Sequence, residues 1–242
     1  EAVELYKKSL QFNPKNASLL EQVILNSFGE NADFASLETY TVMATDEFPE
    51  SAEFWFYDGV VKSARKKDSL AVNSLNKAIE LNQGRNSQLD QVAFGSLGNS
   101  LFNLGQKDSA FHYFDKALQL NPYDEQVLNN FAYFLSLEKR DLEKALSMSE
   151  KVVKKFPENS TYLDTHAWVL FQMGNYQEAL IYMEKAMAND PQPSGVLMEH
   201  YGDILFHLGK VSEAVSWWKK AATSDEASEF ISKKISERKY YE

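Results

Sequence analysis

Three side chains towards the carboxyl end of the sequence combine nitrogen and oxygen donors. His200, Asp203 and His207 stand at positions i, i+3 and i+7, and the period of an α-helix places all three on one helix face. Imidazole nitrogens and carboxylate oxygens are ligands that divalent metals accept. Metal-binding histidine pairs on helices usually have the tighter spacing i, i+4. We therefore expect no metal here, and no other cofactor.

Motifs for catalysis are absent from the sequence. It contains no G-x-S-x-G, no glycine-rich loop that could hold a phosphate, and no cysteine. Serine and aspartate are plentiful, but no motif ties one of them to a histidine. We expect that the chain is not an enzyme.

Composition narrows the classes of partner and location. The 242 residues carry a net charge of −10, which argues against nucleic acid or an anionic membrane surface as the partner. The sequence has no apolar run long enough to span a membrane. It begins at Glu1 rather than methionine, so a signal peptide, a lipid anchor or a further domain could precede it. The lack of cysteine suits an oxidising envelope compartment, and the cytoplasm stays open.

Residues 91–124 show the clearest structural pattern, that of two helices joined by a tight turn. Apolar residues recur on one face of each helix, first Phe94, Leu97, Gly98 and Leu101, then Ala110, Phe114 and Ala117. Gly105 supplies the turn between them, and Pro122 ends the second helix because it lacks the N–H that a helix interior requires.

This unit recurs along the chain. The interval of twelve residues from Ala110 to Pro122 returns at Ala2–Pro14, Leu37–Pro49, Ala145–Pro157 and Ala179–Pro191. Gln83 takes the place of proline in a further unit, and residues 86–90 read as a polar loop extension. We predict a second half-repeat at 1–17 and full repeats at 18–51, 52–85, 91–124, 125–159, 160–193 and 195–228.

The pattern of an aromatic residue, Leu-Gly, Ala-x3-Phe and proline resembles the tetratricopeptide repeat. The resemblance covers essentially the whole chain. It implies an all-α fold, a right-handed α-solenoid of antiparallel helix pairs. The last repeat has Glu226 in place of proline, so a capping helix is expected at 226–241, with Lys234 on its polar face and Ile231 packed inward.

In this family, set positions of each first helix face a concave groove that binds a peptide or protein. Mapped onto this sequence, these positions predict a groove of amides, aromatics and acids: Asn26, Tyr57, Asn99, Asn103, Asn129, Asn130, Tyr133, Asp164, Trp168, Glu199, His200, Asp203, Phe206 and His207. Amides can bond an extended backbone, and aromatics dominate binding hot spots. His166 stands where the repeat usually has leucine, which indicates a buried, hydrogen-bonded histidine.

A subgroup of the family grips a terminal carboxylate with lysine and arginine, which this chain lacks at the matched positions. It has Asp164, Glu199 and Asp203 instead, and these favour a basic or neutral partner segment.

The resemblance implies an interaction scaffold, in a bacterium one that assembles an envelope, secretion or surface complex. Two alternatives stay open: a regulatory or substrate-recruiting arm of a larger enzyme, or a homo-oligomeric structural element. The second would use the helix at 2–12, whose apolar side has no partner from its own repeat and could be covered by another copy.

Overall fold

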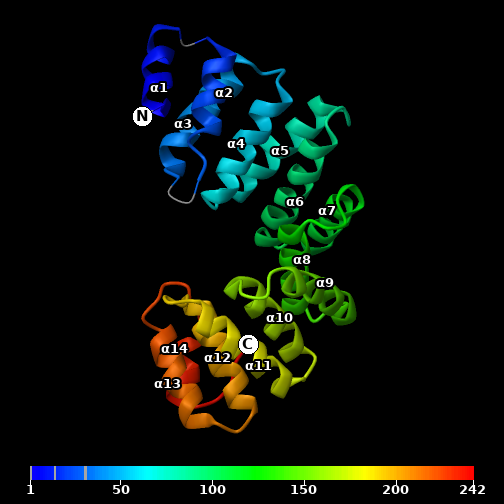
Figure 1. Cartoon of the computed structure of the whole chain (residues 1–242), viewed down its shortest axis with the longest axis vertical. Helices are drawn as coiled ribbons and strands as arrows, with labels where there is room; N and C mark the ends of the chain where they lie inside the picture. The colour runs from blue at the N-terminus through cyan, green and yellow to red at the C-terminus, as the bar shows by residue number, and fades with distance from the viewer. Residues whose placement is uncertain (1, 14, 30–31) are drawn as a thin grey trace. The chain divides into compact units, whose positions relative to one another are not determined.

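The chain is described by a computed structural model that covers residues 2–13, 15–29 and 32–242. All regular structure within these residues is α-helical (Figure 1), which confirms the predicted all-α class. The helices are α1 (Ala2–Phe12), α2 (Ala17–Leu25), α3 (Phe34–Glu47), α4 (Ala52–Ala64), α5 (Asp68–Asn82), α6 (Ser87–Asn103), α7 (Lys107–Leu120), α8 (Glu125–Leu137), α9 (Leu142–Lys155), α10 (Ser160–Gln172), α11 (Tyr176–Asn189), α12 (Gly195–His207), α13 (Val211–Ala221) and α14 (Ile231–Glu237).

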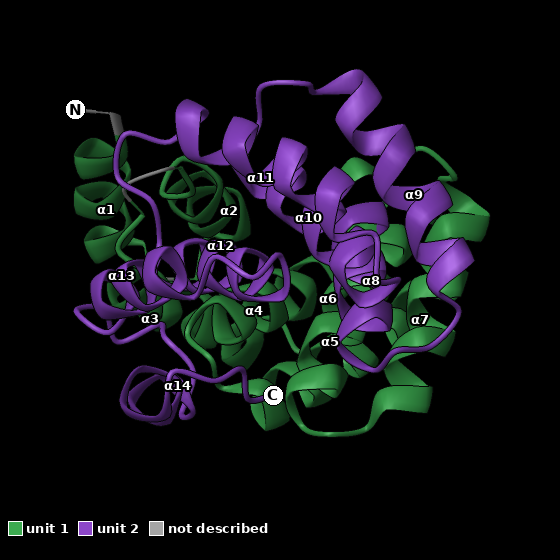
Figure 2. Cartoon of the chain, turned by 90° about the horizontal axis from the view of Figure 1, so that it is seen from below, with its two compact units in different colours: residues 1–127 green, residues 128–242 purple. Residues whose placement is uncertain are grey.

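The chain divides into two compact units, Glu1–Val127 and Leu128–Glu242, which Figure 2 colours separately. Within the first unit α4 packs on α5 and α6 on α7; within the second α10 packs on α11 and α12 on α13. Each of the six predicted full repeats overlaps two consecutive helices, although α2 and α6 begin before the predicted bounds. We call residues 1–127 unit 1 and residues 128–242 unit 2.

Glycines allow the two helices of a repeat to approach closely and to turn tightly. A Cβ atom on Gly98 would lie 2.6 Å from the ring of Phe114, and one on Gly202 would lie 2.5 Å from the ring of Trp218. Both rings are fully buried, so the absent side chain is what lets the helices meet. The turn after α6 uses Gly105 with φ of +76°, a conformation that strains other residues.

Two predicted segments differ from the structure. Residues 86–90 are not a loop extension, because α6 begins at Ser87 and the side chain of Asn86 caps it by accepting from the N–H of Leu89. The capping helix is shorter than expected, since α14 covers only Ile231–Glu237. Two hydrogen bonds tie the segment before α14 to α12. The carboxylate of Glu226 accepts from the N–H of Gly195, and the N–H of Ser228 donates to Glu199.

The amino-terminal helix α1 is only partly covered. Leu10 is buried, whereas Leu5 and Phe12 are exposed. No helix among the described residues has the length and apolar character needed to cross a bilayer.

Candidate functional site

The predicted groove residues Asn26 and Asn103 of unit 1 donate hydrogen bonds within that unit. Asn26 donates to the backbone oxygen of Gln22 at 2.8 Å, and Asn103 donates to Asp68 at 3.3 Å. Tyr57 and Asn99 are half-buried, and burial raises the pKa of the Tyr57 hydroxyl. A cavity of about 330 Å³ in this unit is lined by other residues, on α1 and α3.

In unit 2 the predicted residues come together around two cavities. We call the surface that they line, formed by α8, α10 and α12, the inner face of unit 2. One cavity of about 350 Å³ is lined by Asn129, Asn130, Tyr133 and Asp164. The other, of about 320 Å³, is lined by Tyr133, Trp168, Glu199, His200 and Asp203. Tyr133 and Val196 line both cavities, so the two hollows adjoin.

Aromatic stacking holds the middle of the inner face. Trp168 of α10 lies parallel to the imidazole of His200 of α12, with ring centroids 3.8 Å apart. The indole ring of Trp168 also stacks in parallel on the ring of Phe171, with centroids 4.6 Å apart. Nδ1 of His200 is 2.9 Å from a carboxylate oxygen of Asp164. These contacts fix α10 to α12 and leave Trp168 only 4% exposed, which is more buried than a groove position predicts.

The acidic residues of α12 are paired with a cation from within the chain. Lys234 of α14 is 2.7 Å from Glu199 and 2.7 Å from Asp203. Asp203 also accepts from the indole N–H of Trp218 at 2.9 Å, and Glu199 accepts from the hydroxyl of Ser228. Two of the three carboxylates that were expected to attract a basic segment are therefore engaged by Lys234, which lies buried rather than on a polar outer face.

The pKa values follow from burial and these bonds. Burial acts to raise the pKa of Glu199, but its hydrogen bonds from Lys234 and Ser228 outweigh this and hold the pKa below its ordinary value. Burial raises the pKa of Asp203 to about 6, against the opposing effect of Lys234. Burial raises the pKa of the Tyr133 hydroxyl, and the neighbouring carboxylates of Asp164 and Glu199 add to this. Tyr133 is therefore a neutral hydrogen-bonding group.

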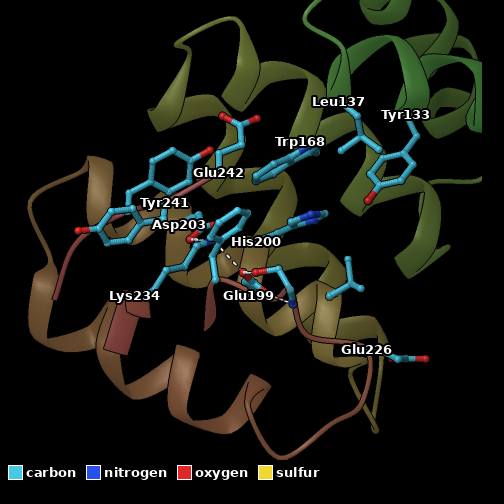
Figure 3. A pocket seen from close by; sticks show the side chains of 14 residues that line it. Tyr133, Leu137, Trp168, Glu199, His200, Asp203, Glu226, Lys234, Tyr241 and Glu242 are labelled. Carbon is cyan, nitrogen blue, oxygen red and sulfur yellow. Dashed lines mark hydrogen bonds and ion pairs between the residues drawn. The ribbon is translucent and has the colours of Figure 1, made fainter. Parts of the chain in front are cut away.

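Residues after α14 return to the inner face (Figure 3). Figure 3 shows Glu242 close to Trp168, and Tyr241 and Glu242 both line the 320 Å³ cavity. Glu242 accepts from Lys139 at 2.6 Å and from Gln172 at 2.9 Å. Burial opposes ionisation of Glu242, but these bonds hold its pKa below the ordinary value.

Three buried polar side-chain atoms have no hydrogen-bond partner among the described residues. Two line the cavities described above: the side-chain oxygen of Asn129, an acceptor, and the indole N–H of Trp168, a donor. The third is the hydroxyl of Tyr240, which follows α14. A buried polar group without a partner is costly. One donor and one acceptor are also what an extended peptide backbone can satisfy.

The remaining predicted residues have local partners. The nitrogen Nδ1 of His207 is 3.0 Å from the backbone oxygen of Asp203, and Phe206 packs against Trp218. His200, Asp203 and His207 thus point to separate partners, and no cluster that could hold a metal forms within the described residues. His166 is buried and 2.8 Å from the hydroxyl of Ser149, as predicted. Burial lowers its pKa to about 4.

Sequence reasoning missed Lys234, Lys139 and Gln172. A signal for Lys234 was present, since two acids on one face of a largely apolar helix require a cation when they are buried. Lys139 and Gln172 come later in the sequence than the groove positions of α8 and α10. They join the site only because Glu242 accepts hydrogen bonds from both.

The stacked helix pairs and their lined inner face define an α-solenoid. Residues 92–124 match a family model of the tetratricopeptide repeat, and residues 165–229 match a second one. Tetratricopeptide repeats are therefore present in both units of the chain. Proteins built from this repeat act in general as scaffolds for protein–protein interaction.

The chain is similar to proteins from several sources. It is 32% identical over 125 residues to the BBSome complex member BBS4 of Bos taurus, over 52% of this chain and 23% of that protein, so it spans about a quarter of the relative's length. The structure resembles a tetratricopeptide repeat protein of Parabacteroides merdae (TM-score 0.71, 18% identity, 98% of this chain and 91% of that one). It also resembles YrrB, described as having an unusual peptide-binding site (TM-score 0.58, 21% identity, 86% and 99% covered).

Proposed function

We propose that the inner face of unit 2 binds an extended segment of another protein. The observation that carries this proposal is the pair of adjoining cavities whose walls hold the unpartnered acceptor of Asn129 and donor of Trp168. An incoming backbone N–H and carbonyl would satisfy both atoms, and Tyr133 between them offers aromatic area. A peptide-binding site in YrrB, which shares the fold, is consistent with this.

In this proposal the partner segment needs fewer basic residues than the sequence predicts. Glu199 and Asp203 are already paired with Lys234, so Asp164 is the acid of the predicted set that lines the 350 Å³ cavity. A role in assembling a bacterial envelope or surface complex stays a prediction, as does self-association through α1.

The test selects peptides from a random phage library against the whole chain and measures their affinities for matched tryptophan variants. Trp168→Phe keeps an aromatic ring in the stack and removes the indole N–H. We expect it to weaken binding about tenfold, since the peptide carbonyl would lose its donor. Trp217→Phe, on the second helix α13, should leave binding unchanged. Equal affinities for the two variants would place the binding surface elsewhere.

A further inference from the structure

The residues that follow α14 form a short extended segment seated on the inner face of unit 2. We call residues 239–242 the tail segment. Helix α14 ends at Glu237, and Arg238 turns the chain with φ of +53°. The tail segment then contacts residues up to 103 positions earlier in the sequence, at Lys139. The chain thereby places a piece of itself where a partner segment is proposed to bind.

The seat of the tail segment has two chemically distinct parts. The ring of Tyr240 meets the imidazole of His207 at 4.7 Å and the ring of Phe171 at 5.8 Å. Lys234 Nζ lies 5.1 Å from the centre of the same ring. This part is an aromatic box with a cation on one side, which suits an electron-rich ring.

The second part of the seat binds a carboxylate. Lys139 and Gln172 both donate to the carboxylate of Glu242, two residues after Tyr240. A cavity of about 170 Å³, lined by Lys139, Phe171, Gln172, Tyr176 and His207 with Tyr240 and Glu242, joins the two parts. The seat thus holds an aromatic residue followed at the second position by an acidic one.

The tail segment is held less firmly than the helix before it. Lys234 is buried between Glu199 and Asp203 and ties α14 to α12. The pair of Lys139 and Glu242 is partly exposed, with 57% and 33% of the side chains accessible, and such pairs contribute little to stability. The contacts that seat the tail segment are thus separate from those that hold α14.

We propose that this seat is a binding site for an aromatic-x-acidic segment of a partner protein, and that the tail segment competes with that partner from within the chain. The inference rests on the proposed function and names the chemistry and regulation of the same face. An internal competitor acts at a high effective concentration, so it lowers the apparent affinity for a partner by the fraction of time that the seat is filled.

The test uses a fluorescein-labelled, carboxyl-amidated peptide with the sequence of residues 237–242 and measures its polarisation with the whole chain. The tail variant Tyr240→Ser with Glu242→Gln should bind this probe at least about tenfold more tightly than the unchanged chain, because the internal competitor is lost. A second variant, Glu242→Lys, places a cation beside Lys139 at the exposed rim and should act in the same direction without disturbing the core.

Matched controls locate the site. In the tail variant, Lys139→Gln should reduce probe binding by up to about fivefold, because it removes the cation that holds the carboxylate. Lys154→Gln, at an exposed position of α9, should have no effect. A probe in which glutamine replaces the last glutamate should bind as weakly to the tail variant as the parent probe does to its Lys139→Gln form.

The outcomes separate this inference from the proposed function. If both tail variants bind the probe no better than the unchanged chain, or if Lys139→Gln matches Lys154→Gln, the inference is overturned. In that case, selected peptides that still depend on Trp168 would leave the proposed function standing. If the selected peptides show no dependence on Trp168 but the probe binds as described, the proposed function fails in its central part while the seat remains.

Discussion

Lys234 Nζ lies 2.7 Å from a carboxylate oxygen of Asp203, and the two residues are only 3% and 1% exposed. They are 31 positions apart, on α14 and α12. Glu199 shares the same ammonium group at 2.7 Å. One buried cation therefore pairs with two buried carboxylates and connects the last helix to the inner face.

Removal of this cation should destabilise unit 2 strongly. Lys234→Met keeps most of the side-chain volume but leaves Asp203 and Glu199 without their charge partner. Breaking a buried ion pair on one side typically costs about 3–5 kcal/mol. Urea denaturation followed by circular dichroism measures the free energy of unfolding.

The control for Lys234 is Lys219→Met, at an exposed position in the last turn of α13, which should change the free energy of unfolding by less than about 0.5 kcal/mol. Adding Asp203→Asn and Glu199→Gln to Lys234→Met should restore part of the loss. A Lys234→Met chain as stable as the parent would show that the cluster carries no net charge stabilisation.

His166 should make the stability depend on pH. Burial lowers its pKa from 6.5 to about 4, so the unfolded chain takes up the proton first as pH falls. The contribution of His166 is complete above about pH 6.5 and disappears as pH falls through about 4, and the shift corresponds to about 3 kcal/mol. In His166→Leu, the drop in the free energy of unfolding between pH 7 and pH 4 should be smaller by up to that amount.

The exposed His112 of α7 provides the comparison for this pH series. His112→Gln should keep the pH profile of the parent. If the profile of His166→Leu coincides with that of the parent, burial of the neutral imidazole does not govern the acid sensitivity.

Gly98→Ala tests the close approach of α6 and α7. Alanine normally favours a helix over glycine by about 1 kcal/mol, but here its Cβ would lie 2.6 Å from the ring of Phe114. Overpacking should prevail and lower the stability by about 1–3 kcal/mol. The melting temperature measures this, with Ser96→Ala in the same helix as the variant that should not lower it. A Gly98→Ala chain that melts above the parent would mean that Phe114 can move aside.

Truncation of Trp168 should affect folding as well as binding. Its indole is buried in stacks with His200 and Phe171, so Trp168→Ala should cost about 3–5 kcal/mol. Trp168→Phe keeps a ring in the stack and should cost less, which is why it is the proper binding variant. Calorimetric melting of the two variants checks the order. Equal melting temperatures would indicate that the stack contributes nothing to stability.

The repeat helices could be predicted from the sequence because their signals are local. Spacing of small and aromatic residues around Gly98 and Ala110, and the stop at Pro122, set the period that the helices follow. The polarity of residues 86–90 predicts a loop, but Asn86 is a favourable N-cap and α6 begins directly after it.

The site could be predicted only in part, because its closing contacts are long-range. The repeat register indicated that Tyr133, Trp168 and His200 would face one side, and they line one cavity. The register could not show that Lys234 would enter the same region. The amphipathic pattern of the last helix fits a solvent-facing position for this lysine equally well. It likewise could not show that residue 242 would reach Lys139.

The turn after α8 shows how a repeat can acquire a chemical group without a change of backbone path. Three corresponding turns use Gly105, Gly174 and Gly209 in the left-handed conformation, with φ of +76°, +81° and +79°, and the turn after α4 uses Lys66 with φ of +57°. Lys139 adopts φ of +51° in its turn, at a strain of roughly 1 kcal/mol. In exchange this connection carries an ammonium group at the mouth of the seat, where glycine would present bare backbone. Lys139→Gly would therefore relieve the backbone strain of this turn and also remove the ammonium group that binds the carboxylate of Glu242.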